Sequence, residues 1–147
     1  MGSGREPALD VLKDKTLLQW LQSAHTTSRF TTSVCSGSLI LAAAGLLPGM
    51  TATTHWNLMD KLTELGAVPI STRVVEHLNQ RILTAAGVSS GIDMALRLAE
   101  LLTDEVTAKA MQLMVEYDPQ PPFDAGTVAK AGPVVVARAK ELFQDKD

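Results

Sequence analysis

Apolar residues recur at helical spacing in several parts of this chain of 147 residues. The first such stretch predicts a helix over residues 7–23, with Pro7 in its first turn. Its apolar positions are Leu9, Leu12, Leu17 and Leu21. Further helices are expected at residues 37–44, 57–65, 90–102, 103–117 and 133–143. The spacing of Ser90 and Asp93 predicts a capping box, and Thr103 is expected to cap the helix that follows it.

Short runs rich in β-branched and aromatic residues lie between these helices. They predict strands at residues 29–34, 50–56, 68–70, 73–77 and 81–85. Strands that alternate with helices indicate an α/β fold with a mostly parallel sheet. The segment "DPQPPFDAG", residues 118–126, is too rich in proline for a helix or a central strand, so we expect an extended loop there.

Composition narrows the classes of function. The net charge is −3 and the 13 basic residues are scattered, which argues against nucleic acid as a partner because phosphate binding requires clustered Lys and Arg. The longest apolar run, Leu39–Pro48, is too short to span a bilayer. A single cysteine excludes an internal disulfide. We therefore expect one domain in a cytoplasmic protein that does not bind membranes.

Cys35 has the sequence context of a nucleophile. It stands between a predicted strand and a predicted helix and is followed by Ser36 and Gly37, as in a nucleophile elbow, although Ser33 replaces the usual glycine two positions earlier. The N-terminal N–H groups of the following helix would favour the thiolate, and the Ser36 N–H would face a developing oxyanion. The alternative is that Cys35 is a small buried hydrophobic residue.

His55 lies at the end of the next predicted strand. Parallel strands in register would bring it close to Cys35, which suits a Cys–His pair, although a hydrogen-bonded, partly buried histidine is an equal alternative. His25 and His77 are expected to be ordinary surface histidines. No zinc-ligand spacing and no G-x-G-x-x-G fingerprint occurs, so neither a metal nor a cofactor is expected. Asp93 is expected to have a structural role as a helix cap.

These residues form a longer motif. The segment "TTSVCSGSLILAAAGLLPGMTATTHW", residues 31–56, resembles the nucleophile region of the DJ-1/PfpI superfamily, whose fold is the flavodoxin-like, class I glutamine amidotransferase-like parallel-sheet sandwich. Two branches share its central pattern, the isonitrile hydratases and the amidase-like sensor domains of AraC-type regulators. "TAAGVSSGIDMALRLAELL", residues 84–102, is similar to a later family segment, and "MQLMVEYDPQPPFDAG", residues 111–126, is similar to the tail of isonitrile hydratases.

The resemblance also covers the start of the chain. "GSGREPAL", residues 2–9, looks like the family's glycine-rich loop, which implies that backbone amides near Gly2 and Gly4 help Ser36 to form an oxyanion hole. Family members carry strands and an acidic residue before this loop. The expected organisation is therefore an N-terminally truncated DJ-1/PfpI domain over residues 1–147, with a tail helix over residues 127–147. Loss of the acid would lower activity by on the order of 10²–10⁴-fold.

The activity that the resemblance implies is hydration of an isonitrile to an N-substituted formamide, with Cys35 as the nucleophile, a thioimidate as intermediate and a homodimer as the assembly. One alternative is a small-molecule or redox sensor in which Cys35 oxidises to a sulfinate. Another is a glyoxalase-like or amidase-like activity, as in other branches of the superfamily.

Overall fold

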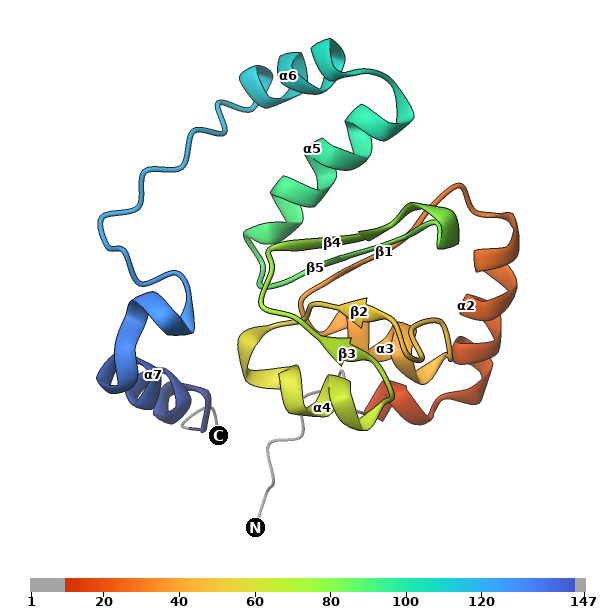
Figure 1. The fold of residues 1–147 in the computed structure, drawn as a ribbon, viewed down its shortest axis with the longest axis horizontal. Coiled ribbons are helices and arrows are strands. Elements are labelled where there is room, and N and C mark those ends of the chain that lie inside the picture. Colours follow the sequence, from red (N-terminus) through yellow and green to blue (C-terminus); the bar gives the residue numbers. More distant parts are fainter. Residues whose placement is uncertain (1–9, 145–147) are drawn as a thin grey trace. The chain divides into compact units, whose positions relative to one another are not determined.

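The computed structural model describes residues 10–144 (Figure 1). These residues form two compact units, residues 10–116 and residues 117–144, which are described separately. The first unit contains the strands, and the second contains one kinked helix. Within residues 10–144, every helix is too short or too polar to span a lipid bilayer.

Two helical segments open the first unit, a short 3₁₀ helix η1 (Val11–Lys13) and the helix α2 (Lys15–Thr27). Asp14 separates them: its backbone is extended, and its carboxylate accepts hydrogen bonds from the N–H groups of Thr16 and Leu17 at 3.0 and 3.1 Å. The prediction of one continuous helix ending at residue 23 is therefore wrong within the described residues, because Asp14 starts a new helix. Residues 7–9 of that prediction lie outside the described part.

The main sheet has the strand order β1 (Thr31–Val34), β5 (Ile82–Ala85) and β4 (Val74–His77). β1 and β5 are parallel, whereas β4 and β5 are antiparallel and are joined by the 3₁₀ helix η3 (Leu78–Gln80). A separate parallel pair is formed by β2 (Thr51–Ala52) and β3 (Val68–Pro69). The α/β class with mostly parallel strands is confirmed. The predicted strand at 50–56 shrinks to two residues, and it does not pair with β1.

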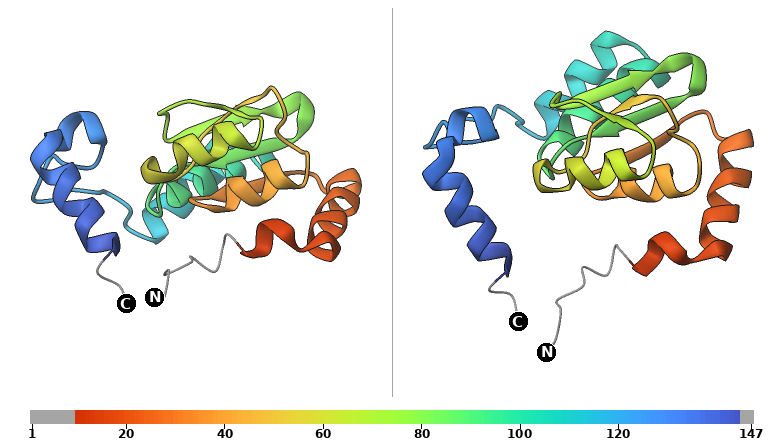
Figure 2. Two further views of the ribbon diagram at one scale, coloured as in Figure 1. Left: turned by 90° about the horizontal axis from the view of Figure 1, so that it is seen from below. Right: turned by 60° about the horizontal axis from the view of Figure 1, so that its bottom comes forward.

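Helices cover both faces of the main sheet (Figures 1 and 2). One face carries α3 (Gly37–Ala43), which precedes β2, and the 3₁₀ helix η2 (Trp56–Leu58) and α4 (Met59–Glu64), which lie between β2 and β3 in the chain. On this face Leu39 and Leu62 pack with Ile82 in a buried cluster. On the other face, α5 (Ser90–Leu102) contributes Met94 to a cluster with Leu83 and Ala85. Residues of β5 therefore alternate between two cores, as the period of a strand requires.

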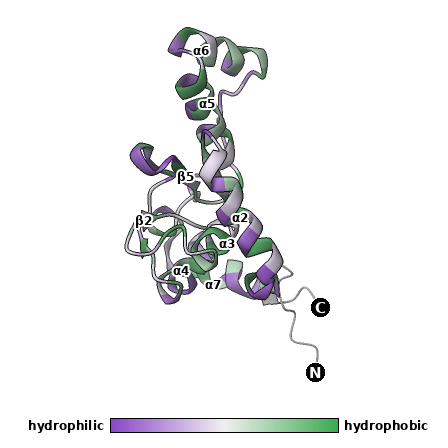
Figure 3. Cartoon of the chain, turned by 90° about the vertical axis from the view of Figure 1, so that its right-hand side faces the viewer, coloured by the Kyte–Doolittle hydropathy of each residue, from purple (hydrophilic) through white to green (hydrophobic). Residues whose placement is uncertain are grey.

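The helix caps differ from the prediction. Ser89, not Ser90, precedes α5 and makes no side-chain cap bond, while Ser90 is buried. The next helix, α6 (Glu105–Met114), is capped by Asp104, whose carboxylate accepts a hydrogen bond from the Thr107 N–H at 2.9 Å. Thr103 instead ends α5. Hydrophobic residues occur along α6 (Figure 3). The side chains of Val106, Leu113 and Met114 are exposed.

The second unit consists of an extended segment and the helix α7 (Val128–Gln144). The loop predicted at residues 118–126 is confirmed, since no helix or strand occurs there. α7 contains a kink at Gly132, which has φ +73°, just before Pro133. The predicted helix at 133–143 corresponds to the part of α7 that follows this kink, and the first turn of α7 lies within the tail helix expected at residues 127–147.

Candidate active site at the Cys35 elbow

Cys35 lies between β1 and α3 with a left-handed backbone, at φ +57°. This conformation costs a residue with a side chain about 1–2 kcal/mol, so the surrounding structure must hold it in place. Ser36 returns to helical angles, and Gly37 begins α3. The order of strand, strained residue and helix is the geometry of a nucleophile elbow, as the sequence predicted.

Four hydrogen bonds fix the Cys35 backbone. Its N–H donates to the carbonyl oxygens of Ala85 at 3.1 Å and Ala86 at 2.7 Å. Its carbonyl oxygen accepts from the Thr54 hydroxyl at 2.9 Å and from the Ser38 hydroxyl at 3.2 Å. The strained residue is therefore held from both sides, by the end of β5 and by two buried hydroxyl groups.

Small side chains surround the elbow. Cys35 is partly exposed. Ser33 is buried, and its hydroxyl has no hydrogen-bond partner within the described part of the chain. A Cβ atom on Gly37 would lie 3.4 Å from the Ser33 Cβ, so a side chain at residue 37 would fill the space beside it. The N–H groups of Ser36 and Gly37 lie at the first turn of α3, where helix N–H groups lack partners within the helix.

His55 lies near the elbow, but strand pairing is not what places it there. Because β1 and β2 do not pair, strand register does not bring His55 to Cys35. Instead, the preceding residue, Thr54, bonds to Cys35, and the His55 Cδ2 atom lies 3.8 Å from the position of a Cβ on Gly87. Gly87 follows Ala86, the acceptor of the Cys35 N–H. The Cys35 backbone and the His55 ring thus both adjoin the segment that follows β5.

Local contacts orient the His55 ring. His55 precedes η2, and its Nδ1 atom accepts a hydrogen bond from the Asn57 N–H at 3.4 Å. The ring is tilted by 40° to the Trp56 ring, at a centroid distance of 5.5 Å. A neutral imidazole that accepts through Nδ1 carries its proton on Nε2, which can then donate a hydrogen bond.

The other two histidines have structural contacts. His25 Nδ1 shares a 2.8 Å hydrogen bond with the Thr31 hydroxyl, and His77 Nε2 lies 2.7 Å from the Thr51 carbonyl oxygen. Both are half-buried, which corrects the expectation of ordinary surface histidines. Gly2 and Gly4, predicted to contribute to the oxyanion hole, lie outside the described residues.

Asp93 pairs with a residue that lies far from it in the sequence. Its carboxylate contacts Arg73 at 2.5 Å, and Arg73 also donates to the Ser89 hydroxyl at 3.4 Å. This contact connects the start of α5 to the segment before β4. Its role is structural, as predicted, but the partner is distant in the sequence.

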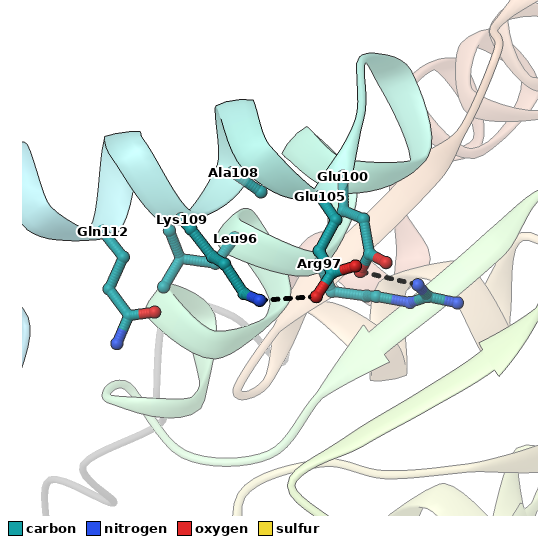
Figure 4. Close-up of a pocket in the computed structure, with 7 residues that line it drawn as sticks. All are labelled: Leu96, Arg97, Glu100, Glu105, Ala108, Lys109 and Gln112. Atoms are coloured by element: carbon teal, nitrogen blue, oxygen red, sulfur yellow. Dashed lines mark hydrogen bonds and ion pairs between the residues drawn. The ribbon is translucent and has the colours of Figure 1, made fainter.

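A shallow groove lies between α5 and α6, with a volume of about 290 Å³ (Figure 4). It is lined by Leu96, Arg97, Glu100, Glu105, Ala108, Lys109 and Gln112. Its charges are already paired: Arg97 contacts Glu100 at 2.7 Å, and Lys109 contacts Glu105 at 2.6 Å. Hydrogen bonds with Glu76 and then Glu100 raise the pKa of Arg97. The groove is therefore a weaker candidate site than the elbow.

The described residues were also compared with the ligand groups that hold metal ions in proteins. Among residues 10–144, no group of three or more His, Cys, Asp or Glu side chains could hold a metal ion.

Two further residues contribute to the site without having been predicted, Thr54 and Ser38. Both stand within the motif of residues 31–56, but neither residue type nor spacing indicates that their hydroxyls meet at one carbonyl oxygen.

Known proteins resemble this chain in sequence and in fold. Isonitrile hydratase from Pseudomonas putida is 44% identical over 140 residues, which cover 95% of this chain and 59% of the hydratase. The HTH-type transcriptional regulator CdhR from Pseudomonas aeruginosa is 33% identical over 82 residues, or 56% of this chain and 24% of the regulator. The chain thus spans about three fifths of the length of the hydratase.

Solved structures of related proteins also share the fold of this chain. A crystal structure of a ThiJ/PfpI family protein from Pseudomonas syringae matches with a TM-score of 0.85 and 42% identity, over 92% of this chain and 55% of that protein. Drosophila melanogaster DJ-1beta shares the fold, with a TM-score of 0.65 at 16% identity. The DJ-1/PfpI family model matches residues 3–101, which include the whole Cys35 elbow. The predicted family is confirmed: the chain belongs to the DJ-1/PfpI family.

Proposed function

We propose that this protein hydrates an isonitrile to an N-substituted formamide, with Cys35 as the nucleophile. The observation that carries the proposal is the left-handed Cys35 between β1 and α3, in a chain 44% identical to an isonitrile hydratase. Cys35 is a partly exposed residue on a strained strand-to-helix turn, a position that suits attack of its thiol on a small electrophile.

The proposed reaction has two stages. The Cys35 thiolate attacks the terminal isonitrile carbon and forms a C–S bond, while that carbon gains a proton, which gives a thioimidate. Water then adds to the same carbon, the C–S bond breaks, and the nitrogen takes a proton as the formamide leaves. The thiolate is regenerated, so the net change is the addition of one water molecule to the isonitrile.

Two groups of residues would assist this chemistry. The Ser36 N–H at the start of α3, together with backbone amides near Gly2 and Gly4, would stabilise charge on the reacting group. We assign proton transfer to His55, since its ring adjoins Gly87 next to the elbow. The family resemblance supports a homodimer as the working form, which light scattering would test. The single cysteine supports a location in the cytoplasm, which cell fractionation would test.

The decisive experiment is incubation of the purified chain with cyclohexyl isocyanide, followed by mass spectrometry of the formamide. We expect product from the wild-type chain and none from Cys35→Ser. Circular dichroism establishes that both proteins are folded. A folded wild-type chain that yields no formamide would contradict the proposed activity.

A second candidate function is redox sensing, which the partly exposed Cys35 and the similarity to a transcriptional regulator favour. In this case mild peroxide would add two oxygen atoms to Cys35 as a sulfinate. Mass spectrometry of the Cys35 peptide tests this, with Cys35→Ala as the control. A thiol that peroxide leaves unmodified would argue against sensing.

A further inference from the structure

The carbonyl oxygen of Cys35 takes no part in the backbone hydrogen-bond ladder of α3. At the start of that helix the Leu39 N–H donates to Ser36 at 3.0 Å, not to Cys35. The left-handed backbone therefore leaves a carbonyl group that other donors must satisfy, because an unpaired buried carbonyl is costly. The hydroxyls of Thr54 and Ser38 supply these bonds.

These two donors differ in what they connect. Ser38 belongs to α3 and lies three positions from Cys35, so its bond is local. Thr54 lies 19 positions away and enters from the segment between β2 and η2, which also carries His55. Thr54 is only 1% exposed, so water cannot readily replace its hydroxyl. Its bond is the shorter of the two, at 2.9 Å.

We propose that Thr54 is a positioning residue that holds Cys35 in its left-handed conformation and fixes the Cys35 backbone relative to the His55 segment. Removal of its hydroxyl would leave the Cys35 carbonyl with the longer Ser38 bond alone, and the strained turn would relax toward ordinary backbone angles. The thiol would then leave its reactive position. This inference rests on the proposed role of Cys35 as nucleophile.

The first test replaces Thr54 with Val, which keeps the shape of the side chain and removes the hydroxyl. We expect kcat for formamide production to fall on the order of 10–100-fold, with a much smaller change in KM, because displacement of a reacting group affects turnover more than binding. Thr54→Ser keeps a hydroxyl and should restore most of the loss. Equal losses in the Val and Ser variants would overturn the proposal.

Two control variants separate positioning from general damage. Thr63→Val removes a threonine hydroxyl that donates to a backbone carbonyl in α4, far from the elbow in the sequence, and should leave kcat unchanged. Leu62→Ala opens a cavity in the core and lowers stability without touching Cys35. If folded Leu62→Ala loses as much kcat as Thr54→Val, the effect of Thr54 is merely structural and the proposal fails.

A spectroscopic measurement decides the proposal even if the chain makes no formamide. The Cα and carbonyl chemical shifts of Cys35 report its backbone conformation by NMR. We expect the left-handed signature in wild type, Thr54→Ser and Thr63→Val, and its loss or averaging in Thr54→Val. A left-handed signature that persists in Thr54→Val would overturn the positioning role, whereas absence of product with these shifts as expected would overturn only the proposed activity.

Discussion

A Cβ atom on Gly91 would lie 3.1 Å from both methyl carbons of Val34. The first turn of α5 therefore rests directly on the last residue of β1, immediately before Cys35. Only a hydrogen fits at residue 91 without displacement of Val34. The packing of α5 on the sheet thus supports the strand end on which the elbow is built.

Replacement of Gly91 with Val should destabilise the protein by about 1–3 kcal/mol through overpacking. Helix propensity alone would favour the substitution, because valine is a better helix former than glycine, so a loss must come from the contact with Val34. Chemical denaturation measures the change. The control is Ala95→Val at an exposed position of α5, where a change within about 0.5 kcal/mol is expected. Equal stability of Gly91→Val and wild type would contradict the close packing.

The left-handed Cys35 predicts an unusual order of stability among its variants. Cys35→Gly should be more stable than Cys35→Ala by about 1 kcal/mol, because glycine adopts positive φ without the Cβ clash. At the helical residue Ala95, the order should reverse, with Ala95→Gly less stable than wild type by about 0.5–1 kcal/mol. Thermal or chemical unfolding compares the four proteins. A Cys35→Ala protein at least as stable as Cys35→Gly would show that the turn carries no strain.

His55→Gln tests proton transfer at the elbow. If His55 donates or accepts a proton in the reaction, this variant should lose turnover by about 10²–10⁴-fold and lose the corresponding limb of the pH–rate profile. His25→Gln is a matched control, since glutamine can keep the hydrogen bond to Thr31. The measurement is steady-state kinetics from about pH 5 to about pH 9, because histidine changes its charge in this region. An unchanged pH profile in His55→Gln would assign the proton to another group.

The features that the sequence predicts well are those encoded within a few residues. The run of Ser33, Cys35, Ser36 and Gly37 after a β-branched stretch is sufficient to indicate a strained strand-to-helix turn, and the structure has Cys35 at φ +57°. The strands at 73–77 and 81–85 were similarly predictable from local composition. Family membership also followed from one continuous motif.

The features that were missed depend on partners distant in the sequence. Asp93 has the spacing of a cap but bonds to Arg73, 20 positions away, and no local rule ranks these two partners. β2 pairs with β3 and not with β1, so the prediction that register would place His55 failed, although Thr54 still contacts Cys35. Pairing between strands is a tertiary choice, which patterns of single segments do not determine.

Arg97 connects α5 to β4 through a two-point contact with Glu76, at 2.9 and 3.1 Å. The side chains are 35% and 28% exposed, so solvent weakens the pair, and we expect a coupling of about 0.5–1 kcal/mol. A double-mutant cycle of Arg97→Met and Glu76→Gln measures it by denaturation, and added salt should reduce it. The more exposed pair of Lys61 and Glu64 serves as control. If the coupling free energy of Arg97 and Glu76 is no larger than that of Lys61 and Glu64, the Arg97 pair contributes no more than an ordinary surface contact.

Asp104 makes the stability of α6 depend on pH. The Thr107 N–H, followed by the Thr107 hydroxyl, lowers the pKa of Asp104 in the folded protein. A lowered pKa means that the ionised cap stabilises the fold above the unfolded value of about 3.9, and that this stabilisation disappears as the pH falls through the folded value. Asp104→Ala should therefore lower the melting temperature at pH 7, which is about three units above the unfolded pKa of an aspartate. In strong acid, the difference in melting temperature between this variant and wild type should vanish. Calorimetry at both pH values measures the melting temperatures. Asp60→Ala, in the first turn of α4, is the control variant. A difference that is independent of pH would mean that the carboxylate charge does not contribute.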